Sequence, residues 1–234
     1  MRCVYGSVLA LAAIVLVPRT GVAQDTETSR AVAGGGISIP GWAGKIDPRE
    51  AAAGQVLNNS KLAKVGDVIH VTTGPAVTYW NAANTVSGNY TVKATFNEAK
   101  YMNLNDHPHP YGIVIGGNDM GTDAGSYLYC AAYGNGMFIV RGFGPAPFQM
   151  NGGRGAANDA VHKAAGPGQP VSQEIAVSVK GDNVECAING TVVASYTKAA
   201  LVMAGKLKST DGVYGIRFAH NTEATVVGLT VVRQ

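Results

Sequence analysis

The chain has 234 residues, of which 46% are hydrophobic and 14% are charged, a composition that excludes an intrinsically disordered protein. The net charge is +3 and the basic residues are scattered singly, so the sequence lacks the clustered basic patch that nucleic-acid binding requires. The 31 glycines indicate many tight turns between short elements.

Residues 1–23 have the pattern of a secretory signal peptide. Arg2 gives a positive start, residues 8–17 form an unbroken apolar run, and small residues precede a cleavage position before Gln24. The apolar run is too short to span a bilayer. We therefore expect an exported protein, periplasmic or extracellular, without a membrane span. Two of the 18 basic residues lie in this segment, so cleavage would leave 16 basic against 15 acidic residues, close to neutrality.

The segment 24–36 is polar and then glycine-rich, which predicts a flexible leader ahead of one domain over 37–234. Residues 90–96 alternate apolar and polar side chains, the pattern of a strand with one buried face. Strands are predicted over 68–72, 76–80, 90–96, 111–115, 126–133, 137–142, 174–180, 184–188, 191–196, 212–220 and 225–232.

Turn and helix signals complete the prediction of an all-β fold. Asn189-Gly190 lies between two apolar runs and predicts a two-residue hairpin turn, in which both residues take positive φ. Helix is expected only over 48–53 and 198–203. Many short strands without intervening helices or internal repeats predict a single antiparallel β-sandwich of jelly-roll type.

Two cysteines follow the predicted cleavage position, Cys130 and Cys186. An even number in an exported protein permits one disulfide. Each lies within an apolar run, where a buried free thiol is equally ordinary. The sequence leaves both alternatives open, because bridging depends on the order of the strands.

A row of tyrosines is the main candidate binding feature. Tyr127, Tyr129 and Tyr133 share one side of their predicted strand, and the aliphatic residues between them share the other. Arg141 of the next strand falls on the tyrosine side by the same alternation. Tyrosine rings and an arginine suit a sugar, which has an apolar face and many hydroxyls. The alternative is that loops cover this face and the tyrosines form a second core.

The segment 143–170 is the one long loop, rich in glycine and proline. We expect it to fold over the tyrosine face and to bring Arg154 and His162 near. Loop acids such as Asp106 and Asp159 are candidates for a catalytic pair, although nothing in the sequence fixes two of them side by side.

The segment 105–110 holds the densest cluster of metal-ligand residue types. In an extended chain His107 and His109 lie on the same side, and with Asp106 they suit a transition metal. A third ligand is not visible locally, although His162 or His220 could approach in the fold. The alternative is a rigid loop with polar side chains.

Several segments resemble exported concanavalin A-like lectin/glucanase domains, near the 3-keto-disaccharide hydrolase domain family. The resemblance covers about 40–232 and is carried by the strings GWAGKID (41–47), GDVIHVTTGPAVTYWN (66–81), SGNYTVKATF (87–96), YGIVIGG (111–117), YLYCAAYGNG (127–136), INGTVVASY (188–196) and DGVYGIRFAHN (211–221). It implies two antiparallel sheets packed face to face, with one concave sheet that holds carbohydrate. Strand alternation predicts that this concave face carries Tyr127, Tyr129, Tyr133 and Arg141, flanked by His107 and Asn118.

The resemblance also implies a calcium ion. Concanavalin A-like domains often hold a structural calcium at a sheet edge, and the loop with Asp119 and Asp123 carries oxygen ligands at short spacing. This loop has fewer carboxylates than a dedicated calcium loop. Ca²⁺ at Asp119 and Asp123 is the one cofactor that the resemblance suggests.

The chain departs from the hydrolases that it resembles. It lacks the Glu-x-Asp-x-x-Glu strand of laminarinase-type glucanases, and the strand at 127–130 lacks the Tyr-Glu pair of the keto-disaccharide hydrolases. The leading hypothesis is thus a non-catalytic carbohydrate- or glycan-binding module of the cell envelope. A hydrolase or lyase acting on a sugar derivative and a structural or protein-interaction domain are the alternatives. An enzyme requires at least two titratable groups that meet in one pocket.

Overall fold

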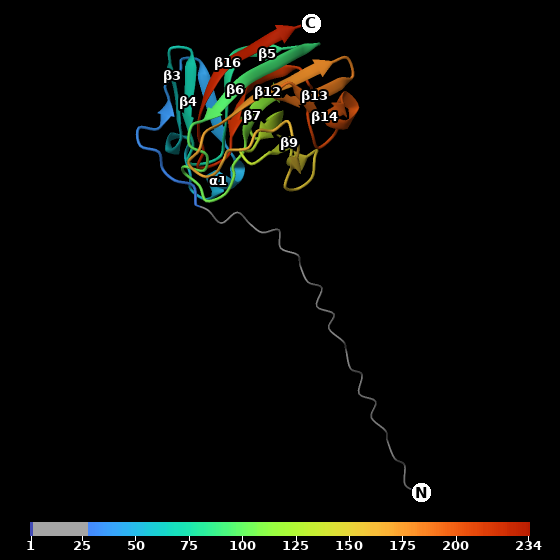
Figure 1. The fold of residues 1–234 in the computed structure, drawn as a ribbon. Helices are drawn as coiled ribbons and strands as arrows, with labels where there is room; N and C mark the ends of the chain where they lie inside the picture. Colours follow the sequence, from blue (N-terminus) through green and yellow to red (C-terminus); the bar gives the residue numbers. More distant parts are fainter. Residues whose placement is uncertain (2–27) are drawn as a thin grey trace.

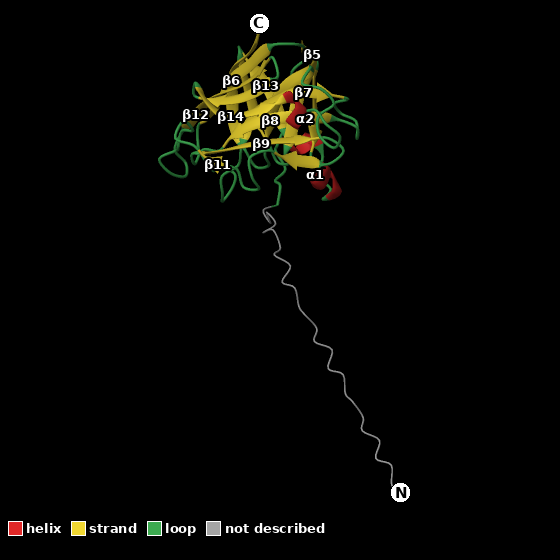
Figure 2. Ribbon diagram, turned by 90° about the vertical axis from the view of Figure 1, so that its right-hand side faces the viewer, coloured by secondary structure: helices red, strands yellow, loops and turns green. Residues whose placement is uncertain are grey.

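The computed structural model describes residue 1 and residues 28–234 (Figure 1). The predicted cleavage position and residues 2–27 lie outside the described residues. Within the described part, the chain folds into two β-sheets, and the helices are short pieces at the surface (Figure 2). No helix among residues 28–234 has the length and hydropathy that crossing a membrane requires.

The sheet that we call the back sheet contains eight strands in the described chain. In spatial order they are β1 (Gly36–Ile37), β3 (Lys61–Val65), β4 (Val68–Thr72), β16 (Glu223–Arg233), β6 (Tyr90–Glu98), β12 (Val171–Lys180), β13 (Asn183–Ile188) and β14 (Thr191–Thr197). The first pair, β1 and β3, is parallel, and the other neighbours are antiparallel.

The sheet that we call the front sheet is antiparallel throughout. In spatial order its strands are β10 (Pro147–Gln149), β9 (Met137–Phe143), β8 (Ser126–Ala132), β7 (Tyr111–Asn118), β15 (Gly212–Phe218), β5 (Val77–Val86) and β2 (Trp42–Ile46), with β11 (Ala156–Ala157) also paired to β9. The helical segments are α1 (Pro48–Ala52), the 3₁₀ turn η1 (Leu57–Asn59) and α2 (Lys198–Leu201).

The predicted antiparallel β-sandwich is confirmed, and each of the eleven predicted strands corresponds to an observed one. The sequence did not indicate β1, β2, β3, β10 and β11. These strands are short or lie at or next to sheet edges, where one-sided burial is weak. The hairpin turn at Asn189-Gly190 is also confirmed, because φ is 50° at Asn189 and 81° at Gly190.

The core lies between the inner faces of the two sheets. Strand β6 shows how the sequence directs side chains into this core: its alternate residues from Tyr90 to Phe96 are buried, while the intervening ones reach the surface. A disulfide joins Cys130 of β8 to Cys186 of β13, with Cα atoms 6.0 Å apart. The alternative of two free thiols is therefore wrong, and the bridge connects the front sheet to the back sheet.

Candidate functional site

The outer face of the front sheet carries the tyrosine row. Leu128, Cys130 and Ala132 belong to the main core, whereas Tyr129 belongs to a second apolar cluster on the opposite side of β8. This cluster is formed by residues of β7, β8 and β9 and the segment that follows β8: Val114, Tyr129, Ala131 and Ile139, with Tyr127, Tyr133 and Phe143 packed against them. Strand alternation therefore places the tyrosines on the predicted side.

A pocket of about 590 Å³ lies beside this cluster. Tyr129, Tyr133 and Arg141 line it from the sheet side, so the tyrosine face is only partly closed. The other walls come from the leader, α1 and its flanking residues, strands β8 and β15, and the segments before β5, before β7 and after β15. Their residues are Thr28, Ser29, Asp47, Arg49, Glu50, Ala53, Gln55, Ala76, His107, Pro108, His109, Pro110, Ala131, Arg217, Ala219 and His220. Figure 1 shows α1 at the end of the domain where the described chain begins.

Arg217 of β15 is a buried residue at the pocket and is fully engaged. Its Nη1 and Nη2 donate to the two carboxylate oxygens of Asp47 at 2.7 and 2.6 Å, a bidentate pair. Nη1 also donates to Thr78 Oγ1 at 2.9 Å, and the guanidinium lies 4.8 Å from the centre of the Tyr129 ring. Burial opposes the charge and lowers the pKa of Arg217, but Asp47, Tyr127 and Tyr129 together outweigh it, so the pKa is raised and Arg217 stays cationic.

Three histidines meet at the pocket wall. His107 and His109 come from the loop before β7, and His220 follows β15. One nitrogen of each ring lies within 4.8 Å of the others. His107 Nε2 is 2.8 Å from His109 Nε2, and the His109 and His220 rings stack with centroids 4.2 Å apart. Of the two partners considered for His107 and His109, the fold brings His220 and not His162.

The leader contributes to the same wall. Ser29 Oγ donates to Glu50 Oε2 at 2.6 Å and lies 3.3 Å from His220 Nδ1. Arg30 donates its backbone N–H to Asn221 Oδ1 at 2.9 Å. The structure therefore places residues 28–30 of the expected leader against the domain, with Glu50 Oε1 4.0 Å from His220 Nδ1.

Two of the six predicted binding residues lie outside the pocket. Tyr127 faces an adjacent hollow of about 280 Å³ that Trp80 and Phe143 also line, and its hydroxyl is 2.9 Å from Thr78 Oγ1. Asn118 donates to the backbone oxygens of Gly116 and Asp211, so it fixes the end of β7. Tyr129, Tyr133, Arg141 and His107 are the four that the fold brings together.

Burial is the main cause that raises the pKa of the Tyr127 and Tyr133 phenols, so both are neutral hydroxyls. Neutral hydroxyls both donate and accept hydrogen bonds, as sugar hydroxyls do. This part of the outer face therefore combines aromatic surface, neutral hydroxyls and one unpaired arginine donor, since Arg141 Nε is buried without a hydrogen bond among the described residues.

The loop acids expected to hold calcium make ion pairs. Asp119 pairs with Lys208, and Asp123 Oδ1 lies 3.3 Å from Lys45 Nζ. Over residues 28–234, the histidine cluster is the one group of three or more ligand residues close enough to share a metal, and neither aspartate belongs to it. The calcium expectation thus gains no geometric support.

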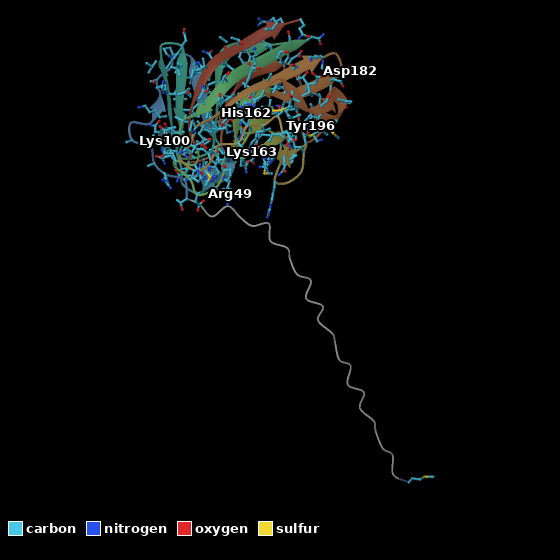
Figure 3. The ribbon with its side chains drawn as sticks, in the orientation of Figure 1. Arg49, Lys100, His162, Lys163, Asp182 and Tyr196 are labelled. Atoms are coloured by element: carbon cyan, nitrogen blue, oxygen red, sulfur yellow. A yellow bond between two sulfur atoms is a disulfide. The ribbon has the colours of Figure 1, made fainter. Side chains whose placement is uncertain are left out.

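The long loop reaches the tyrosine face only along its edge, where residues 143–147 line the hollow beside Tyr127. Its segments β10 and β11 pair with β9, and Gly153 accepts a hydrogen bond from Arg141 Nη2 at 2.6 Å. His162 instead contacts β12, where its Nδ1 is 2.8 Å from Ser172 O. Figure 3 shows His162 apart from Arg49, which lines the pocket. The exposed edge of β9 explains this path, because its free backbone N–H and C=O groups can form hydrogen bonds with further strands such as β10 and β11.

Sequence reasoning missed Asp47, Glu50 and Arg217. One signal was present for Arg217: it alternates with Tyr214, Ile216 and Phe218, which are core residues. That pattern places Arg217 on the outer face, but only the strand order places it beside Tyr129. Asp47 and Glu50 surround the start of a five-residue helix and carry no comparable signal.

No family model matches the sequence, and no curated protein matches it. The fold is similar to the carbohydrate-binding module CBM66 from Bacillus subtilis, with 10% identity over 83% of this chain and 97% of that chain, and a TM-score of 0.53. A Bacillus subtilis protein of unknown function with a galectin-like fold matches at 11% identity over 82% and 90%, with a TM-score of 0.55.

The exoplasmic/lumenal domain of VIP36, in its Ca²⁺/Man2-bound form, matches at 9% identity over 84% of this chain and 82% of that chain, with a TM-score of 0.52. At these identities the comparisons establish the fold alone. The fold is a concanavalin A-like β-sandwich.

Proposed function

We propose that the protein is an exported carbohydrate-binding protein of concanavalin A-like type whose ligand occupies the pocket beside Tyr129. The observation that carries the proposal is the convergence of Tyr129, Tyr133 and Arg141 with Glu50 in one hollow on the outer face of the front sheet. A similar sandwich is itself described as a carbohydrate-binding module. The pattern of residues 1–23 and the disulfide both suit an oxidising compartment outside the cytoplasm.

The contacts available in the pocket match the chemistry of a sugar. Tyr133 is partly exposed and offers a ring face and a hydroxyl, whereas Tyr129 is 6% exposed and contacts Arg217. Arg141 is held by Gly153 through Nη2, while its Nε hydrogen points to no acceptor in the part of the chain that is described. The guanidinium of Arg141 lines the pocket and supplies a positive charge that a hydroxyl or carboxylate of a ligand can contact.

The adjacent hollow extends the proposal to an oligosaccharide. Tyr127 and Tyr129 have ring centroids 6.4 Å apart and line different hollows on the same face. The Asp47–Arg217 pair lies between them, because Asp47 lines both. A ligand with at least two sugar units would contact both hollows, so we expect longer chains to bind more tightly than single sugars.

A glycan array followed by calorimetry with the best-binding oligosaccharide tests the proposal. Tyr133→Ala removes a stacking surface and Arg141→Met removes charged donors, so each should weaken binding about tenfold, or about 1.4 kcal/mol. Thr91→Ala is the matched control, since Thr91 pairs with Ser178 on the back sheet, away from the pocket.

Two outcomes would contradict the proposal. Equal binding by wild type and all three variants would place the ligand elsewhere on the molecule. Absence of any glycan ligand, from a protein shown to be folded by circular dichroism, would leave the pocket without its proposed role.

A second candidate function is a hydrolase or lyase acting on a sugar derivative, such as the keto-disaccharides of the resembling family. The observation that favours it is that His107, His109, His220 and Glu50 line the same pocket, which meets the requirement for convergent titratable groups. Product release from an oligosaccharide that binds, lost in Glu50→Gln, would support the enzyme; binding without turnover supports the binding module.

A further inference from the structure

Three of the five histidines of the chain lie in one cluster at the pocket wall. His109 is 5% exposed and His220 is 9% exposed, whereas the side chain of His107 is 41% exposed. Their elements are adjacent because β7 pairs with β15, with Tyr111 opposite Phe218. The cluster is therefore held by the sheet and opens toward the pocket through His107.

Hydrogen-bond partners fix the tautomers of two rings. His109 Nδ1 lies 2.5 Å from the backbone oxygen of His220, and a carbonyl oxygen only accepts, so this nitrogen carries the hydrogen. Asn105 Nδ2, 3.3 Å from the same nitrogen, donates to the backbone oxygen of Asn221 at 2.9 Å. His107 Nδ1 lies 2.5 Å from Asp106 Oδ1 and likewise donates.

This arrangement leaves the lone pairs of two nitrogens facing each other. In neutral rings with hydrogen on Nδ1, both Nε2 atoms are acceptors, yet these atoms are 2.8 Å apart. Two acceptors at that distance repel unless a cation lies between or beside them. A proton would serve these two rings only, whereas a metal ion would also use the nearby nitrogen of His220.

We propose that His107, His109 and His220 bind one divalent transition-metal ion of the zinc type. Three imidazoles are a borderline-soft donor set that suits Zn²⁺, Co²⁺, Ni²⁺ and Cu²⁺ and disfavours Ca²⁺ and Mg²⁺. The carboxylate of Asp106 and the carbonyl of His220 orient the rings of His107 and His109, as outer-shell groups do at metal-binding histidines. Three protein ligands leave a tetrahedral ion one position for water or a pocket ligand.

The distances between the ligand nitrogens, 2.8 Å for the His107–His109 pair and up to 4.8 Å within the cluster, lie on both sides of the spacing that a tetrahedral ion requires. Nitrogen ligands about 2.0 to 2.1 Å from a tetrahedral ion are about 3.3 Å apart. The two Nε2 atoms at 2.8 Å would separate by about half an ångström to accept the ion. His107 is the ring with room to move because it is the exposed one.

The test is a metal titration of the purified protein, produced without a polyhistidine tag and treated with a chelator. We expect one Zn²⁺ per chain by mass spectrometry of the metal content, and a visible Co²⁺ absorption band typical of a tetrahedral site. His107→Ala and His220→Ala should each weaken Zn²⁺ binding more than about tenfold. Loss of an outer-shell partner already weakens metal binding by about ten- to a hundredfold, and these variants remove a direct ligand. His70→Ala is the control, because His70 is exposed on β4 of the back sheet.

The exposed His107 makes the test independent of folding, since its removal takes no side chain from the core. Absence of stoichiometric Zn²⁺ in wild type would overturn the proposal and assign the contact between the Nε2 atoms to a shared proton. Equal affinity in His107→Ala and His70→Ala would also overturn it. The titration contains no carbohydrate, so its result is separate from that of the proposed glycan binding.

Discussion

Arg217 determines much of the shape of the pocket. A planar guanidinium can bind one carboxylate with two donors and still place its faces against aromatic rings, which lysine cannot do. Arg217 does both, with Asp47 at its edge and the rings of Tyr129 and Phe143 at 4.8 and 5.1 Å. The guanidinium is rigid because the carboxylate at its edge and the aromatic rings at its faces all fix the orientation of its plane. The site is therefore preorganised at its base.

A buried titratable carboxyl lies outside the pocket. Glu98 ends β6, is 4% exposed, and accepts a hydrogen bond from Met102 N at 3.2 Å through Oε1. Its Oε2 is buried and makes no hydrogen bond among residues 28–234. Burial raises the pKa of Glu98 to about 7, with the Met102 bond opposing the shift. The phenols of Tyr101 and Tyr111 are its titratable neighbours.

We predict that Glu98→Gln removes one part of the pH dependence of stability. A carboxyl whose pKa is raised from 4.5 to about 7 by folding stabilises the folded state below pH 4.5 and loses that contribution as pH rises through 7. Wild type should therefore lose up to about 3 kcal/mol relative to Glu98→Gln between pH 4.5 and pH 8. Urea unfolding of both proteins at several pH values measures it. Parallel stability curves would show that the pKa of Glu98 is normal.

At the level of elements, the strands were predictable because their side chains alternate, whereas the site was predictable only in part. Tyr129 could be assigned to the outer face from β8 alone. The approach of His220 to His109 depends on the pairing of β15 with β7, which places Phe218 opposite Tyr111. These strands are about a hundred residues apart, and no local pattern specifies their adjacency. The same pairing places Arg217 at the pocket.

The hairpin between β13 and β14 gives a prediction for one turn. Gly190 has φ of 81°, and an added Cβ would meet no atom within 4 Å, so strain is the only cost of a side chain there. Gly190→Ala should lower the free energy of unfolding by about 1 kcal/mol. Gly166→Ala is the matched control, since Gly166 has equal space without a positive φ. Chemical denaturation compares them, and equal stability of the two variants would contradict the turn geometry.

At the scale of the molecule, the disulfide connects the candidate site to the opposite sheet. Cys130 lies on the core side of β8, next to Tyr129 on the outer side, and its partner Cys186 belongs to β13 of the back sheet. The bridge closes a loop with a sequence separation of 56 residues. Because β8 and the back sheet make no other covalent link over residues 28–234, the bridge restricts separation of the layers directly beneath the pocket.

We predict that replacing both cysteines, in Cys130→Ala with Cys186→Ala, lowers the free energy of unfolding by about 4 kcal/mol, the chain-entropy value for a loop of this length. Titration of the denatured, unreduced protein should recover neither thiol, and reductant should shift wild type toward the variant. Recovery of both thiols would disprove the bridge. An oxidised wild type no more stable than the double variant would show that packing alone holds the two sheets. While it is folded, the double variant should bind the pocket ligand as tightly as wild type does, because Cys130 faces the core and contributes no atom to the pocket lining. Its affinity should fall only near the temperature or denaturant concentration at which it unfolds.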